Sequence, residues 1–211
     1  GEISPRQIWS AAQQRKLSAP QWGAPIDKFL AEVGWREFCY QLLDLFNDMP
    51  AKPFKEQFAG FPWGNDSKHL SAWQRGQTGY PIVDAGMREL WHTGFMHNRV
   101  RMIVASFLTK HLLIDWRWGE AYFAAKLLDF DLASNIGGWQ WASGSGLDAA
   151  PYFRIFNPAE QTKKFDPKFS YIKKWVPEFE TNQYTSLISR SLVIDCKEND
   201  QIERVKKIIF H

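Results

Sequence analysis

Apolar residues recur at helical spacing through most of this chain of 211 residues. No stretch alternates between apolar and polar side chains, or is rich in β-branched residues, in the way that a strand with hairpin turns requires. A helix buries one stripe of its surface, so repeated stripes separated by glycine and proline indicate several helices around a core. We therefore expect an all-α fold.

Capping and breaking residues set the expected boundaries. Ser4 and Pro5 are typical of an N-cap and a first helical position. A long helix is expected over residues 26–47, and shorter ones over residues 70–74, 81–92, 98–114, 119–129 and 199–209. Segments 48–66 and 132–166 are rich in glycine and proline and are expected to be loops. The second also holds several aromatic residues, and loops of that kind tend to build functional sites.

The charge balance excludes a strongly basic protein. There are 26 basic and 23 acidic residues, so any basic surface must come from their arrangement. Cys39 and Cys196 lie far apart, and the five histidines show no ligand-pair spacing, so we expect neither a disulfide framework nor a metal site. No signal peptide or apolar span is evident, and a cytoplasmic location is expected.

Two clusters carry candidate chemistry. Asp129 and Asp131 are expected at a helix end, where the macrodipole disfavours carboxylates, so they need donors such as ligand hydroxyls or Arg101. Glu32, Trp35 and Arg36 fall on one face of the long helix. A solvated helix end and ordinary surface decoration are the alternatives.

Several motifs, in order along the chain, carry a resemblance. They are Gly1-Glu-Ile-Ser-Pro-Arg6, Trp35-Arg-Glu-Phe38, Gly79-Tyr-Pro-Ile-Val-Asp-Ala85, His97-Asn-Arg99, Asp115-Trp-Arg117, Asp129-Phe-Asp131, Asn135-Ile-Gly-Gly-Trp-Gln-Trp141 and Ala149-Ala-Pro-Tyr-Phe-Arg-Ile-Phe-Asn-Pro158. Together, over about residues 1–180, they resemble the FAD-binding helical domain of the photolyase and cryptochrome family, most closely the class I cyclobutane pyrimidine dimer photolyases. Residues 1–182 would form this domain, and 183–211 its C-terminal segment with a final helix.

The resemblance implies light-driven repair of pyrimidine dimers in DNA, by electron transfer from reduced FAD. Two alternatives remain: a cryptochrome-like flavin photosensor, and a truncated module that binds DNA or a partner without flavin. The family's phosphate-holding Thr-Ser-x-Leu-Ser-Pro segment and its antenna domain would both precede Gly1. We therefore expect this chain by itself to bind FAD weakly or not at all, and to bind no antenna chromophore.

The resemblance also assigns roles to residues that match the family's motifs. The residues expected at the cofactor are Phe29, Arg36, Arg101, Asp129, Phe130, Asp131 and Asn135, with Asn135 near flavin N5. Those expected to face the dimer or the DNA are Glu32, Trp35, Asn98, Arg99, Met102, Trp141, Arg154 and Gln161. Glu32 would stabilise the dimer radical, while Trp139, Trp116 and Trp63 would relay an electron from the surface to the flavin.

Overall fold

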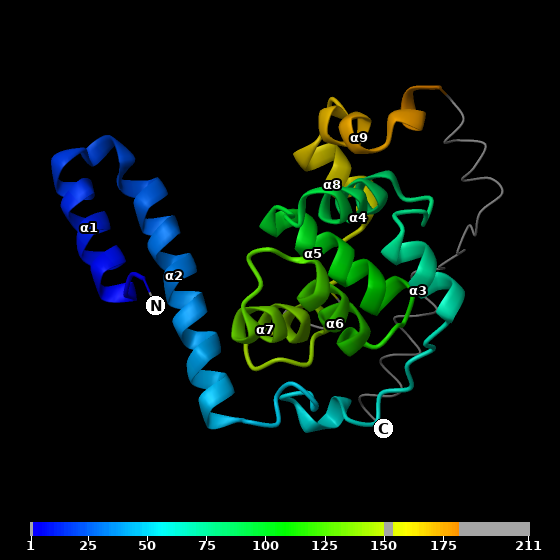
Figure 1. Cartoon of the computed structure of the whole chain (residues 1–211), viewed down its shortest axis with the longest axis horizontal. Coiled ribbons are helices and arrows are strands. Elements are labelled where there is room, and N and C mark those ends of the chain that lie inside the picture. The colour runs from blue at the N-terminus through cyan, green and yellow to red at the C-terminus, as the bar shows by residue number, and fades with distance from the viewer. Residues whose placement is uncertain (1, 150–153, 182–211) are drawn as a thin grey trace. The chain divides into compact units, whose positions relative to one another are not determined.

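The structure, a computed structural model, describes residues 2–149 and 154–181 (Figure 1). Within these ranges every regular element is helical, which confirms the all-α expectation. The chain divides into two compact units, residues 1–49 and 50–211, although no composition shift marks that boundary. The helix expected over residues 199–209, and the segment 183–211 that contains it, lie outside the described residues.

The first unit is a helical hairpin. Its elements are α1 (Pro5–Ser18), the 3₁₀ turn η1 (Pro20–Trp22) and α2 (Gly23–Leu45). The Ser4 cap is confirmed: its hydroxyl accepts from the Gln7 backbone N–H, while the Gln7 side chain accepts from the Ser4 N–H. The two helices pack along each other, and an ion pair of 2.6 Å between Lys16 Nζ and Asp27 joins them.

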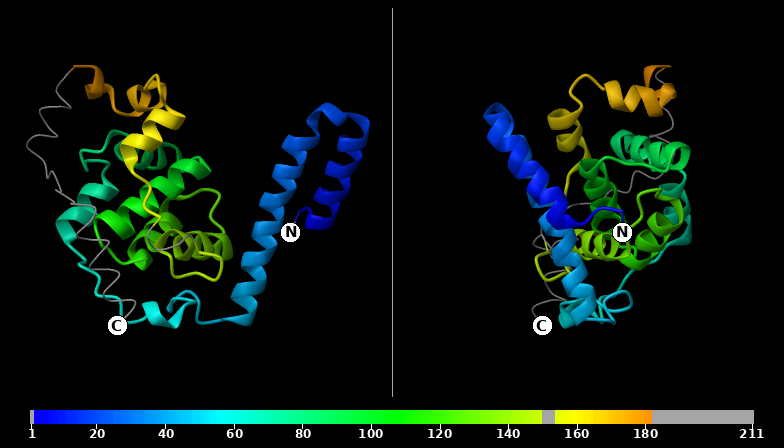
Figure 2. Two further views of the ribbon diagram at one scale, coloured as in Figure 1. Left: turned by 180° about the vertical axis from the view of Figure 1, so that it is seen from behind. Right: turned by 60° about the vertical axis from the view of Figure 1, so that its left-hand side comes forward.

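The second unit gathers shorter helices, which Figure 2 shows from two further sides. They are η2 (Glu56–Phe58), α3 (Ser67–Gln74), α4 (Pro81–Thr93), α5 (Asn98–Ser106), the π-helical turn η3 (Phe107–His111), α6 (Trp116–Lys126), α7 (Leu132–Ser143), α8 (Pro158–Phe165), α9 (Ser170–Trp175) and η4 (Pro177–Thr181). Helix α4 packs against α5 on one side and α9 on another, and α6 packs against α7.

The helices expected over 26–47, 70–74 and 119–129 begin three residues earlier, at Gly23, Ser67 and Trp116, and two further expectations are wrong. The segment 132–166 is not one loop, because it contains α7 and α8. Gly137 and Gly138 weaken α7, but its buried residues Ile136 and Trp139 pack into the core, and that burial outweighs a local cost of about 1 kcal/mol per glycine. The helix expected over 98–114 changes to π-helical geometry after Ser106.

The core of the second unit forms around α4. Val83, Ala85 and Met87 are fully buried there, and Gly86 lets α5 approach closely. A Cβ atom built on Gly86 would lie only 2.5 Å from Val100 Cγ1. The missing side chain therefore sets the spacing between α4 and α5, and α5 carries part of the candidate site.

Candidate functional site

Arg101 and Asp129 form the ion pair at the centre of the candidate site. From α5, one terminal nitrogen of Arg101 donates to both carboxylate oxygens of Asp129 at 2.8 and 3.0 Å. The Nε atom donates to the Met96 carbonyl at 2.5 Å, and the guanidinium lies 5.5 Å from the centre of the Phe95 ring. Arg101 therefore fixes the connection between α6 and α7 against the start of α5.

Asp131 has a different role from the one expected at a helix end. Helix α6 already ends at Lys126, and Asp131 is the N-cap of α7, where its carboxylate accepts from the Ser134 N–H at 2.8 Å. The macrodipole favours a carboxylate at this end. The expectation that both acids stand at an unfavourable helix end is therefore wrong, because α6 ends three residues before Asp129, and Asp131 caps the start of the next helix.

Asn135 is oriented by Glu120. Its Nδ2 group donates to the Glu120 carboxylate at 2.9 Å and to the Glu120 backbone carbonyl at 3.1 Å. Partial burial raises the pKa of the Glu120 carboxyl, and the hydrogen bond from Asn135 opposes that change. Because Nδ2 makes these two bonds, Asn135 has its acceptor oxygen Oδ1 to offer to a ligand N–H group.

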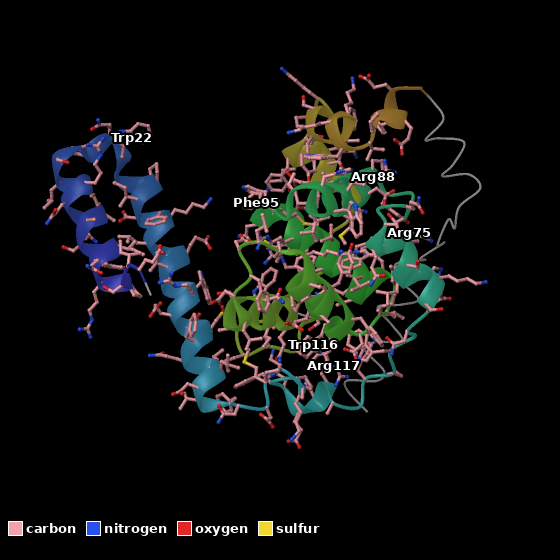
Figure 3. The ribbon with its side chains drawn as sticks, viewed as in Figure 1. Trp22, Arg75, Arg88, Phe95, Trp116 and Arg117 are labelled. Carbon is pink, nitrogen blue, oxygen red and sulfur yellow. The ribbon has the colours of Figure 1, made fainter. Side chains whose placement is uncertain are left out.

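The three expected relay tryptophans lie in different settings. Trp139 is buried in α7, with its ring 5.0 Å from Phe123, and Trp116 is buried at the start of α6, next to Arg117 (Figure 3). Trp63 is half-buried and packs on Phe61 with a ring distance of 4.3 Å. The structure therefore places two of them in adjoining helices, and the relay stays a prediction.

Trp73 was not singled out from the sequence. It is fully buried in α3, its ring centre lies 6.0 Å from that of Trp139, and its indole N–H donates to the Val104 carbonyl at 3.1 Å. No local pattern distinguishes it from the other tryptophans of the chain. Its ring also contacts Tyr122 and Phe123 of α6, and these contacts between elements set it apart.

The expected DNA-facing residues of the second unit cluster around aromatic rings. Trp141 stacks on Phe156 at 6.2 Å, and the Arg154 guanidinium lies 5.5 Å from the centre of the same Phe156 ring. Arg99 lies 4.8 Å from the centre of the Phe165 ring on α8. The structure therefore brings Trp141 and Arg154 together through Phe156, a residue whose role the sequence did not indicate.

Three further expected DNA contacts are less closely tied to this cluster. Asn98 is exposed at the start of α5, and Met102 is half-buried one turn later. Gln161, on α8, has a buried Oε1 atom with no hydrogen-bond partner in the described part of the chain. A buried acceptor of this kind needs a donor from water or from a ligand.

The remaining expected residues belong to α2, in the first unit. Glu32 is exposed, Trp35 packs edge-on against Phe38 at 5.7 Å, and Arg36 pairs with Glu37 at 3.2 Å. Phe29 borders a shallow hollow with a cavity volume of about 260 Å³. The other residues of its lining are Arg15, Trp22, Pro25 and Ile26. The roles expected for these residues at the dimer and the cofactor stay predictions.

The described ranges contain neither a metal site nor a membrane-spanning helix. No cluster of histidine, cysteine or carboxylate side chains there has the geometry to hold a metal ion. Among the same residues, no helix combines the length and the apolar character that crossing a membrane requires.

Comparison with known proteins defines the family. Residues 29–207 match the family model described as the FAD binding domain of DNA photolyase. Because the match covers most of the chain, this chain belongs to the family of DNA photolyase FAD-binding domains. The membership expected from the sequence motifs is confirmed.

Individual relatives agree with this assignment. The deoxyribodipyrimidine photo-lyase of Agrobacterium fabrum is 55% identical over 180 residues, covering 85% of this chain and 37% of that protein. A bacterial class III photolyase from Agrobacterium tumefaciens is 51% identical with a TM-score of 0.79, covering 88% of this chain and 38% of that one. A Synechocystis cryptochrome is 39% identical with a TM-score of 0.78, and the match covers 84% of this chain and 36% of that one. This chain therefore spans less than 40% of each relative, and the narrower assignment to class I stays a prediction.

Proposed function

We propose that this chain is the flavin-binding and catalytic part of a light-driven enzyme that repairs cyclobutane pyrimidine dimers in DNA. The observation that carries the proposal is the fixed orientation of Asn135 by Glu120. Reduced flavin has an N–H group at N5, and the Asn135 Oδ1 acceptor would suit that group. Bound FAD would supply the light-driven electron that opens the cyclobutane ring, and the electron would return to the flavin once the ring is open.

The residues around Arg101 fit such a cofactor. The Arg101–Asp129 pair offers a charged, hydrogen-bonding edge, while Phe95 and Phe130 beside it expose apolar ring surface. A flavin nucleotide combines a flat apolar ring with polar ribityl and phosphate groups, so it needs both kinds of surface. In this proposal Asp131, besides capping α7, holds the cofactor with Asp129.

The DNA-facing side would be built from Trp141, Arg154 and Arg99. A flipped-out dimer needs an apolar stacking surface, and base stacking on an aromatic side chain contributes about 1–3 kcal/mol per base. Arginine side chains beside that surface would bind the phosphates without sequence preference. The family motif also assigns Glu32 and Trp35 of α2 to contacts with the dimer.

Repair of a thymine-dimer oligonucleotide tests the proposal. Because the chain by itself is expected to bind FAD weakly, the protein is first loaded with excess FAD and reduced. It is then illuminated, and dimer loss is measured by chromatography. Trp141→Ala should weaken dimer binding by about 5- to 150-fold, the range that follows from 1–3 kcal/mol. The control is Trp9→Ala, at an exposed residue of α1, which should leave dimer binding unchanged. If flavin-loaded protein binds the oligonucleotide but removes no dimer in light, the proposal is wrong.

A flavin photosensor is the second candidate, favoured by the similarity to the Synechocystis cryptochrome. Both functions use light and flavin, so flavin binding does not separate them. Light-dependent removal of dimers does, because a sensor without repair activity would leave the oligonucleotide unchanged.

A further inference from the structure

Lys110 is a buried cation outside the residues of the candidate site. It lies in η3 with only 9% of its surface exposed, and its ammonium donates to the backbone carbonyl of Arg154 at 2.9 Å. A carbonyl neutralises no charge, and the Arg154 guanidinium nearby adds a like charge. Lys110 is therefore held in a place that is unfavourable for an ammonium.

Burial lowers the pKa of Lys110 to about 8, with a smaller contribution from Arg154 in the same direction. An apolar residue of similar length would occupy this space without that cost. Replacement of buried charges by apolar groups is often neutral or stabilising. A gain in overall stability therefore does not explain why a lysine occupies this position. Its hydrogen bond to the Arg154 backbone carbonyl does.

Ser106 makes a second bond to the same segment. The Phe156 backbone N–H donates to the buried Ser106 hydroxyl oxygen at 3.3 Å. Ser106 is the last residue of α5, and the chain then widens into η3, where Leu112 N–H bonds to the Phe107 carbonyl five residues earlier. Such π-helical turns often occur at functional sites. Lys110 within this turn and Ser106 just before it hold the backbone at positions 154 and 156.

The held segment contacts the expected dimer-stacking surface. Phe156 is buried and stacks on Trp141 with an angle of 29° between the rings. The Arg154 guanidinium lies over the same Phe156 ring. A shift of the backbone at residues 154–156 would therefore move the ring that supports Trp141. It would also move the cation beside that ring.

We propose that Lys110 is a positioning residue, which anchors residues 154–156 so that Phe156 holds Trp141 in the orientation that recognises damaged DNA. The inference rests on the proposed function, because that function gives Trp141 and Arg154 their roles. Lys110 itself would not contact the DNA. Its effect would appear in selectivity for the dimer rather than in overall affinity.

Hydrogen exchange in the free protein tests the anchor without DNA. Lys110→Met keeps the length of the side chain and removes the ammonium, while Lys68→Met removes one exposed lysine of α3 as the control. The Phe156 amide should exchange at least tenfold faster in Lys110→Met and at the wild-type rate in Lys68→Met, with the amides of α4 unchanged in both. Equal Phe156 exchange in the two variants overturns the inference.

Binding then tests the effect on selectivity. In Lys110→Met, the ratio of dissociation constants for undamaged and dimer-containing DNA should fall about tenfold, while affinity for undamaged DNA should match that of Lys68→Met. The melting temperature should stay equal or rise. A structural role alone would lower the melting temperature and leave the selectivity ratio unchanged, which would contradict the inference.

Ser106→Ala provides an independent variant. It removes the second bond to the segment and should raise Phe156 exchange several-fold and lower the selectivity ratio in the same direction. If the wild-type protein binds dimer-containing and undamaged DNA equally well, the proposed function is refuted. If the wild type prefers dimer-containing DNA but the Phe156 amide exchanges at the wild-type rate in both variants, only the anchor is refuted.

Discussion

At the scale of single residues, two neighbouring carboxylates have separate tasks. Asp129 receives two hydrogen bonds from Arg101, while Asp131 caps α7. Their sequence motif places them together but does not say which acid pairs with the arginine. The pair is partly exposed, with 26% of the Arg101 side chain and 49% of the Asp129 side chain accessible, so solvent screens it.

A double-mutant cycle measures this pair. Arg101→Met and Asp129→Asn, singly and combined, should show a coupling free energy of about 0.5–1.5 kcal/mol in denaturant unfolding, since two hydrogen bonds strengthen a partly screened pair. The largely exposed pair Lys163–Glu160 is the control and should give no more than about 0.5 kcal/mol. Equal coupling in the two cycles would show that the Arg101 geometry adds nothing.

At the scale of elements, close packing between α6 and α7 places Trp139. A Cβ atom on Gly119 would lie 2.1 Å from the Trp139 ring and 2.7 Å from Leu108 Cδ2, whereas one on Gly138 meets nothing within 4 Å. Both glycines are inside helices, so local propensity treats them alike. Only the tertiary contacts distinguish them.

Matched substitutions test that distinction. Gly119→Ala should lower the free energy of unfolding by about 1–3 kcal/mol, because overpacking exceeds the gain in helix propensity. Gly138→Ala should raise it by about 0.5–1 kcal/mol. Chemical denaturation of both variants is the measurement, and stabilisation by Gly119→Ala would contradict the close packing of Gly119 against Trp139.

The π-helical turn η3 should also contribute to acid sensitivity. Burial lowers the pKa of His111 from 6.5 to about 4. Between those two pH values the unfolded chain binds a proton that the folded chain does not, so the free energy of unfolding falls as the pH is lowered through this window.

His111→Leu should flatten the decline in stability between pH 6.5 and 4, a contribution of up to about 3 kcal/mol in the wild type. Urea unfolding at several pH values would measure it, with His92→Leu on the exposed surface of α4 as the control. A slope in His111→Leu identical to that of the wild type would show that His111 takes up its proton in the folded protein as well.

At the scale of the whole molecule, contacts between distant segments organise the second unit. Fully buried Gln140 of α7 accepts from the Phe54 N–H at 2.8 Å and donates to the Lys52 carbonyl at 3.0 Å. These bonds hold a loop more than eighty residues away in sequence. Gln140 was part of a recognised motif, but its role is evident only in the fold.

Gln140→Leu keeps the volume of the side chain but removes both bonds. It should lower the free energy of unfolding by about 2–4 kcal/mol, because buried backbone groups lose a partner. Gln57→Leu, at an exposed position of η2, should change it by less than about 0.5 kcal/mol. If denaturant unfolding shows the same change in the free energy of unfolding for both variants, the structural role assigned to Gln140 is wrong.

The sequence by itself determined the helical class, the Ser4 cap and the family, and it predicted the residues of the candidate site. These depend on signals that act within a few residues, or on motifs that can be compared directly. It also predicted a loop over 132–166, where two helices form, because glycine content is a local property and the burial that stabilises α7 is not.

Only the tertiary structure decided the pairing of Arg101 with Asp129, the contact of Trp73 with Trp139 and the anchor from Lys110 to the Arg154 backbone. Each joins residues on different elements, so no spacing along the chain encodes it. Burial changes the energy of a charge or a polar group only once another element covers it. That is why the residue types of the candidate site could be named from the sequence, while the interactions that orient them could not.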